Sequence, residues 1–528
     1  MELLMTGEKQ SSKGRSGFSS PVIAFGSKRL RPKHALLIIM LVAYLLRLLL
    51  LANEGQFRFV DESRYRRATH AADLIFQGDI ASAFQSLFTY ARHPGFTITG
   101  LVPALFHRAV YQLIPPSDET WEDYWYSRYS DFRISSLIFV IPSVLTIGVI
   151  FLIARQAGAP ESEALLAAFL LSACNTFFMY SQHFLPYDIS ILIGLCALLL
   201  AIRPHQTSFK YAMAVGSLAF LTLWVYHGYL TFVIMLGLIY CFFIVRNPRI
   251  AILRALGMTT GAMAIFAPLY FFNLWIMDIN IIDQLSEFAT TITHGEYAEG
   301  IVLPFLYFRH AEGGIALIWS AGLGIAAWRI WRDRTSVAKH RVFLWFASLL
   351  LLFFLMSFLS NGLKMFVVYG RVARAMAPFI VLLCAYGFEP LLIRFGSRAT
   401  AIFVAVVSLL ALANFAPIIG LHHYRMVQRH VYSNYKGVSF ESTFGPDSKP
   451  HGYRGAYVPT ERFKLVNAGV FYPVTEITER PAGKVLLEIP HYARVKALQY
   501  EGMSAESRDL FNNNDLKMWL IDTENPDD

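Results

Sequence analysis

The chain carries little charge for its length. Only 16% of its 528 residues are charged and 55% are hydrophobic, whereas about 25% of the residues in a soluble globular protein are charged. This scarcity excludes a soluble globule. Separate apolar runs of ~20 residues are present instead, and they predict a polytopic membrane protein built mainly of α-helices.

Cysteine is scarce as well. The four cysteines lie inside apolar runs and include no Cys-x-x-Cys pair: Cys174, Cys196, Cys241 and Cys384. Thiols in such positions act as small packing residues. Neither a disulfide framework nor a thiolate zinc site is therefore predicted.

A single basic patch is also absent, although the formal net charge is +9. The basic residues are spread over short segments between apolar runs, which is the positive-inside pattern of membrane proteins. A nucleic-acid partner is excluded on this ground, because nucleic-acid binding requires the charge to be gathered on one face. The partners predicted here are membrane lipids.

The first apolar run, 35–52, follows a basic, Ser/Gly-rich segment, 1–33, which we expect to be a disordered cytoplasmic tail. At ~1.5 Å per residue the run can cross a bilayer. It lacks a small-residue cleavage site and is predicted to be an uncleaved anchor. Arg47 lies near its outer end, where a charge indicates either a function or snorkelling to the interface.

Further apolar runs bring the predicted total to about eleven spans. They are 35–52, 134–154, 163–181, 187–202, 211–226, 228–245, 255–275, 313–331, 342–360, 372–392 and 399–419. Alternate connections are rich in Arg and Lys, whereas the turns near 182–186 and 226–229 have none. This asymmetry predicts a cytoplasmic N-terminus and an extracytoplasmic C-terminus in the cell (inner) membrane.

Two segments are not spans. In the first outer loop, 53–132, helical periodicity from Glu62 predicts a helix lying in the membrane interface, and a second helix is expected over Thr97–Leu113. The transmembrane domain is thus predicted to cover 34–420. Residues 421–528 change to a soluble composition, which predicts a small extracytoplasmic α/β domain.

That C-terminal domain has local signals of its own. The stretches KVLLEIPHY and LKMWLID are typical of strands, and a short helix is expected around Ala505–Asn512. No acid–base cluster occurs in it, so we expect an accessory role.

Polar residues at the outer ends of the spans are the candidates for chemistry. These are Asp61, Glu62, Arg92, His93, Asp188, Arg371 and Arg374. A carboxylate can act as a general base, whereas Arg and His neutralise a phosphate. Together they predict one outward-facing site for an anionic substrate.

Each candidate also has a structural interpretation. Asp61 precedes an amphipathic helix and fits an N-cap. Asp188 begins a span and fits a solvated boundary residue, and His93 precedes a proline and fits a turn. Arg371 and Arg374 fit anchors for lipid headgroups.

The order of these features resembles the GT-C superfamily of membrane glycosyltransferases. They are a basic N-terminus, a span with Arg47, the motif D-E-x-R-Y over Asp61–Tyr65, and the late segment VYGRVARAMAPFIVLLCAYG. The closer similarity is to the bacterial branch that includes protein O-mannosyltransferases and the lipid A aminoarabinose transferase (PMT-like). The resemblance covers about 30–420 in pattern.

The resemblance implies roles for individual residues. Asp61 would be the base that activates the acceptor, with Glu62 beside it, and Asp188 a second acidic site residue. Residues implied to hold the donor phosphate are Arg64, Tyr65, Arg92, His93, Arg371 and Arg374. The family often has a Lys-Pro-Pro or His-Pro-Pro turn in the first loop, whereas this chain has Arg-His-Pro-Gly.

The implied reaction is a polyprenyl-phosphate-sugar-dependent glycosyl transfer (EC 2.4 class) at the outer face of the membrane. A polyprenyl-phosphate-linked sugar would be the donor, since no nucleotide sugar is expected outside the cell membrane. A glycan, lipid or protein would be the acceptor, and displacement at the anomeric carbon would invert it. No cofactor is required, although a divalent metal is compatible with the reaction.

Other functions also fit a polytopic chain. A lipid-linked sugar transporter would be expected to have repeated halves, which are not seen. An enzyme like an O-antigen ligase or polymerase would be expected to place its large outer loop late, whereas here it comes first. A non-catalytic GT-C scaffold would have the same sequence pattern.

Overall fold

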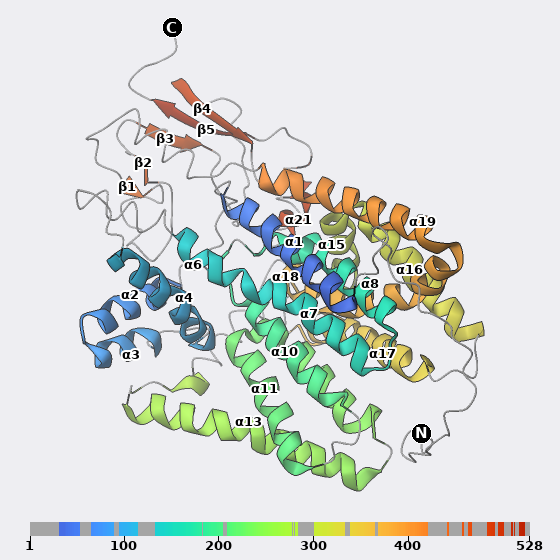
Figure 1. The fold of residues 1–528 in the computed structure, drawn as a ribbon. Coiled ribbons are helices and arrows are strands. Elements are labelled where there is room, and N and C mark those ends of the chain that lie inside the picture. Colours follow the sequence, from blue (N-terminus) through green and yellow to red (C-terminus); the bar gives the residue numbers. More distant parts are fainter. Residues whose placement is uncertain are drawn as a thin grey trace.

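The computed structural model (Figure 1) describes residues 31–52, 65–88, 94–113, 132–181, 183–203, 208–245, 247–276, 278, 280–283, 300–332, 338–364, 368–420, 441–442, 457–458, 463–466, 483–490, 495–500, 508–509, 512 and 517–522. Helices make up most of this part of the chain, and the strands lie together at one end of the helical bundle.

The helices follow one another in this order: α1 (Pro32–Ala52), α2 (Tyr65–Phe76), α3 (Ile80–Phe88), α4 (Pro94–Leu113), α6 (Phe132–Phe139), α7 (Ile141–Gln156), α8 (Glu161–Ser172), α9 (Asn175–Phe178), α10 (Tyr187–Ala201), α11 (Phe209–Val225), η3 (His227–Tyr229), α12 (Leu230–Leu238), η4 (Ile239–Phe243), α13 (Pro248–Ile276), η5 (Gly300–Val302), α15 (Leu303–Glu312), α16 (Gly314–Arg332), α17 (Ala338–Ser357), η6 (Phe358–Gly362), α18 (Gly370–Ala373), η7 (Arg374–Met376), α19 (Ala377–Ile419) and α21 (Lys496–Gln499).

The chain is a membrane protein of mainly α structure, as predicted. Six helical segments of the described residues are long and apolar enough to cross a membrane: Pro32–Leu51, Ser135–Gln156, Pro248–Trp275, Gly314–Arg332, Lys339–Gly362 and Gly370–Ile419. Three shorter apolar helices accompany them, Tyr187–Ala201, Phe209–Val225 and His227–Phe243. All of them coincide with predicted spans, whereas the total of about eleven stays a prediction.

Some predicted spans differ in detail from regular helices. The segment expected over 163–181 is divided into α8 and the short α9. The spans expected at 372–392 and 399–419 are joined in one long helical segment: the first begins in α18 and η7 and continues into α19, and α19 changes direction at Gly396. This glycine has a φ of +79°, a left-handed conformation that is costly for other residues, and no atom lies within 4 Å of its missing Cβ.

The hydrophobic core lies along the inner helices of the bundle, and the outer helices turn apolar side chains outward. On α1, Ala43, Arg47 and Leu50 face inward, whereas Leu37 and Leu41 are 63% and 53% exposed. Exposed leucines on a helix of this length are expected to contact lipid. The first span thus contributes one face to the core and one to the membrane.

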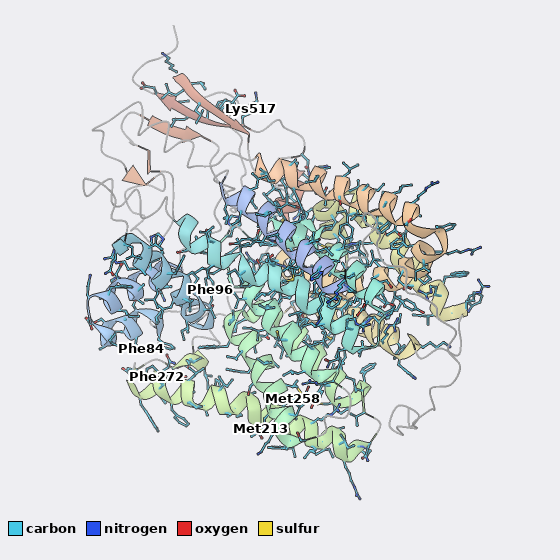
Figure 2. All side chains as sticks on the ribbon, in the orientation of Figure 1. Phe84, Phe96, Met213, Met258, Phe272 and Lys517 are labelled. Atoms are coloured by element: carbon cyan, nitrogen blue, oxygen red, sulfur yellow. The ribbon has the colours of Figure 1, made fainter. Side chains whose placement is uncertain are left out.

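Small residues let α11 and α13 approach closely. Gly257 and Gly261 of α13 form a Gly-x-x-x-Gly pair that packs on Ala212 and Met213, and Gly216 of α11 packs on Met258. Figure 2 labels Met213 and Met258 on these neighbouring helices. Small residues at such spacing allow backbones to meet in membrane proteins, where lipid removes the usual hydrophobic drive for association.

Replacement of Gly261 by alanine is expected to lower the melting temperature of the purified protein. A Cβ there would overlap the Met213 backbone oxygen, and overpacking of this kind costs about 1–3 kcal/mol. Gly324→Ala is the matched control, because nothing lies within 4 Å of that position and alanine favours the helix. Equal melting temperatures for the two variants would contradict the close contact.

In the described residues of 53–132, the segment predicted to be the first outer loop, there are three helices, α2, α3 and α4, where two were expected. The helix predicted over Thr97–Leu113 is confirmed and begins earlier, at Pro94. The helix predicted from Glu62 begins at Tyr65 in the described part of the chain. Residues 62–64 lie outside the described residues.

The additional helix, α3, follows a tight turn. Gly78 has a φ of +85°, and the Asp79 carboxylate accepts a hydrogen bond from the Ser82 backbone N–H at 3.0 Å, as an N-cap does. Hydrogen bonds from Ser82 lower the pKa of Asp79. The rings of Phe84 and Phe88 then pack on Phe272 near the end of α13, with centroids 6.5 and 5.5 Å apart (Figure 2).

In the described part of residues 421–528, the strands form two antiparallel sheets. They are β1 (Glu441–Ser442) with β2 (Tyr457–Val458), and β3 (Phe463–Val466), β5 (Lys517–Asp522) and β4 (Lys484–Pro490), in that spatial order. The strands predicted in KVLLEIPHY and LKMWLID are confirmed as β4 and β5. Of the helix expected around Ala505–Asn512, only residues 508–509 and 512 are described, and they are helical.

Candidate active site

The centre of the candidate site is a buried ion pair between Asp188 and Arg374. Asp188 lies in the first turn of α10, where the helix dipole favours a negative charge, and Arg374 begins η7. The Arg374 guanidinium donates to Asp188 through Nη2. Both are buried, with 0% of the Arg374 surface and 5% of the Asp188 surface exposed. Two of the predicted site residues therefore contact each other.

Aromatic rings surround the Arg374 guanidinium. Its Cζ lies 4.4 Å from the ring centroid of Phe177 and 4.8 Å from that of Tyr180. Within the described part of the chain, its Nε and Nη1 atoms have no hydrogen-bond partner. The cation is thus held by one carboxylate and by the ring faces. Because the side chain is sealed from solvent, it is poorly placed to meet a substrate directly.

Arg371 lies one turn earlier in the chain and is partly exposed. Its guanidinium Cζ is 4.3 Å from the Tyr369 ring centroid and 5.6 Å from that of Tyr187. The hydroxyl of Tyr229 donates to the Arg371 carbonyl at 3.3 Å. Of Arg371 and Arg374, Arg371 is therefore the accessible one.

The Asp188–Arg374 ion pair lies beside a row of tyrosine rings. Ring centroids are 5.4 Å apart for Tyr180 and Tyr187, 4.7 Å for Tyr187 and Tyr226, and 5.1 Å for Tyr226 and Tyr229. All are edge-to-face contacts, which favour fixed ring orientations. The row connects the turn after α9, the start of α10 and η3.

Arg47 supports the same region from α1. Its Nε donates to Ser143 Oγ at 2.9 Å and its Nη2 to the Phe177 carbonyl at 2.9 Å, and only 1% of its surface is exposed. The snorkelling explanation for this charge is therefore wrong, because the side chain points into the bundle. It fixes the short helix α9 whose Phe177 ring contacts Arg374.

Sequence reasoning missed Glu312, at the end of α15. Its carboxylate accepts hydrogen bonds from the backbone N–H groups of Asn175 and Thr176 at 2.9 and 3.0 Å, and Asn414 donates to its carbonyl at 2.7 Å. Burial raises the pKa of Glu312 to about 7. An acidic residue next to a long apolar run was the available signal, but its partners are distant in sequence.

The first-loop helices pack beside the start of α10. Ala68 and Ala72 of α2 and Phe96 of α4 share one hydrophobic cluster with Phe184 and with Ile189, the neighbour of Asp188. The Phe96 ring contacts Phe139, which contacts Phe184, with centroids 5.9 and 5.1 Å apart (Figure 2). The first-loop helices are thereby connected to the start of α10 through the rings of Phe96, Phe139 and Phe184.

The remaining predicted residues are only partly placed. Tyr65 is the first residue of α2. The others lie outside the described residues: Asp61, Glu62, Arg64, Arg92 and His93. Among the described residues, no three His, Cys, Asp or Glu side chains come close enough together to hold a metal, and no reaction step is assigned to one.

No protein-family model matches the chain, and no curated protein matches its sequence. Among solved structures, it is similar to ArnT from Cupriavidus metallidurans bound to undecaprenyl phosphate, at 13% identity over 76% of this chain and 72% of ArnT, with a TM-score of 0.46.

It is also similar to the Archaeoglobus fulgidus oligosaccharyltransferase in the apo form, at 12% identity over 78% of this chain and 59% of that chain, with a TM-score of 0.41. The same enzyme, AglB, in complex with an inhibitory peptide and a dolichol-phosphate matches at 13% identity over 77% and 59%, with a TM-score of 0.41.

Proposed function

We propose that the protein is a membrane glycosyltransferase that moves a sugar from a polyprenyl-phosphate-linked donor to an acceptor at the outer face of the cell membrane. One observation carries the proposal. The Asp188–Arg374 ion pair and the partly exposed Arg371 lie at the start of α10, and α2, which follows the D-E-x-R-Y motif, shares a hydrophobic cluster with Phe184 and Ile189 of the same region.

Arg371 is the group best suited to the donor phosphate. A partly exposed arginine whose guanidinium lies near two tyrosine rings can offer paired N–H donors to a phosphate while the rings favour a fixed orientation. The lipid tail of the donor would lie along the apolar helix faces. A nucleotide-linked donor would need neither these faces nor a site at the end of the spans.

The proposed reaction is a single displacement. An oxygen of the acceptor attacks the anomeric carbon and loses its proton to Asp61, while the bond between that carbon and the phosphate oxygen breaks. The phosphate leaves with the electron pair, and the configuration at carbon is inverted. Glu62 orients the acceptor. Arg371, with Arg64, Tyr65, Arg92 and His93, offsets the charge that builds on the departing phosphate.

The ion pair has a different role in this scheme. Asp188 and Arg374 neutralise each other in a sealed environment. We assign them to positioning, with Arg374 fixing the turn that carries Arg371. This assignment replaces direct phosphate binding by Arg374 and a direct role for Asp188 as a second acidic site residue.

The proposed orientation places this end of the bundle outside the cell. Basic residues lie at the opposite end. Arg155 is in the last turn of α7, and Arg329 and Arg332 are in the last turn of α16. Arg341 of α17 pairs with Glu163 of α8 at 2.6 Å. Such residues favour the cytoplasmic side. The strands of 421–528 would then be extracytoplasmic.

The proposal is tested with the purified full-length protein in nanodiscs. We expect a polyprenyl-phosphate sugar to co-purify, as identified by mass spectrometry, and to be converted to polyprenyl phosphate when an acceptor is added. Movement of the intact lipid-linked sugar across sealed vesicles, without release of polyprenyl phosphate, would instead identify a transporter. Transfer of a preassembled glycan chain would favour an O-antigen ligase or polymerase.

A further inference from the structure

The C-terminal segment contacts the turn that carries both arginines of the candidate site. The backbone N–H of Gly370 donates to the Tyr500 carbonyl at 3.1 Å. Gly370 is the first residue of α18 and directly precedes Arg371. The expectation of a merely accessory tail therefore needs to change, because the tail bonds to the backbone next to the proposed phosphate ligand.

Tyr500 is itself held firmly. Its ring stacks on His310 of α15, with centroids 5.3 Å apart and planes inclined by 14°, and the Arg508 guanidinium lies 4.8 Å from the same ring. Burial, Lys496 and Arg309 lower the pKa of His310, so a neutral imidazole makes this stack at neutral pH. The carbonyl of Tyr500 is thereby kept in place by groups on both α15 and the tail.

The tail also shares the core of the membrane domain. Leu498 and Leu520 belong to the same buried cluster as the helices, with 3% and 0% of their surfaces exposed. Gln499, next to Leu498, is buried and donates to Asn512 at 3.3 Å. Residues 495–500 are thus packed as part of the bundle.

We propose that Tyr500 is a positioning residue for the donor-phosphate site and that it acts through the α18 turn on Arg371. The turn is held from two sides: the Tyr229 hydroxyl bonds to the Arg371 carbonyl, and the Tyr500 carbonyl bonds to the Gly370 N–H. Release of the second contact lets the backbone at Arg371 move, and the guanidinium loses its fixed direction. This inference rests on the proposed function, since it assumes that Arg371 binds the donor phosphate.

The test measures binding of polyprenyl phosphate to the full-length protein in nanodiscs. Tyr500→Ala, which removes the stacked ring, is expected to weaken binding about tenfold, within the range of coupling seen between neighbouring residues. Tyr500→Phe keeps the ring and should bind like the wild type. Lys517→Ala is the matched control and should also bind like the wild type. It removes a side chain from β5 of the same tail (Figure 2), where this lysine forms an ion pair with Glu488 of β4.

A double-mutant cycle separates positioning from general stability. If Tyr500 acts through Arg371, Tyr500→Ala should weaken binding no further in an Arg371→Ala background. If Tyr500→Ala weakens polyprenyl phosphate binding equally in the wild-type and Arg371→Ala backgrounds, the inference is wrong. It is also wrong if Tyr500→Ala alone binds like the wild type while Arg371→Ala alone binds poorly. If Arg371→Ala itself binds normally, the phosphate role in the proposed function is wrong.

A second variant covers the case in which Tyr500→Ala does not fold. His310→Ala removes the stacking partner from α15 and leaves residue 500 unchanged. It must reproduce the weaker binding, with a melting temperature measured alongside. Normal binding by folded His310→Ala would contradict the proposed positioning.

Discussion

Replacement of Asp61 by asparagine is expected to give a folded protein that binds the lipid donor and transfers almost no sugar. A general base must accept a proton, which a carboxamide cannot do. General-base catalysis contributes typically ~10²–10⁴-fold to rate, and a loss in that range is expected for kcat. The assay is sugar transfer by purified protein, with donor binding and melting temperature measured on the same sample.

The same variant separates the base from the alternative role as an N-cap. Asn caps helices about as well as Asp, so a cap would survive the substitution, whereas loss of a cap costs only about 0.5–2 kcal/mol. Glu62→Gln is the neighbouring control and should lose less activity, because Glu62 is assigned to orientation alone. If Asp61→Asn keeps more than about a third of the wild-type rate, the loss is far smaller than removal of a general base would cause. Asp61 would then be an N-cap.

Features that depend on local pattern were predictable from the sequence. Long apolar runs gave the helices that cross the membrane, since about 20 apolar residues at helical rise match the bilayer core. The strands β4 and β5 followed from alternating and β-branched residues. Helix α3 was missed because nine residues are too few for a periodicity argument, and only the Gly78–Asp79 turn signalled its start.

Features that depend on packing were not predictable. Asp188 and Arg374 are 186 residues apart in the chain, and the sequence indicated a shared side of the membrane without indicating contact. Whether Arg47 has a function or snorkels to the interface depended on which face of α1 meets Ser143. Hydropathy alone does not determine that face. The Tyr500–Gly370 bond joins two backbone groups, so no side-chain motif could reveal it.

Removal of either member of the Asp188–Arg374 pair is expected to destabilise the protein strongly. Both side chains are buried, and loss of one partner leaves an uncompensated charge, which costs about 3–5 kcal/mol. Asp188→Leu and Arg374→Met are therefore expected to lower the melting temperature sharply and to reduce transfer, because the turn that carries Arg371 is no longer fixed.

The double variant, Asp188→Leu with Arg374→Met, distinguishes positioning from catalysis. An apolar pair of similar volume can replace a buried ion pair with little loss of stability, and the rings of Phe177 and Tyr180 offer an apolar wall for the new methionine. We expect the double variant to be more stable than either single variant, by about 3–5 kcal/mol, which is what an unpaired buried charge costs, and to recover transfer activity with the restored turn. A stable double variant that remains inactive would mean that the Asp188 carboxylate takes part in the chemistry, and Asp188 would then replace Asp61 as the first candidate for the base.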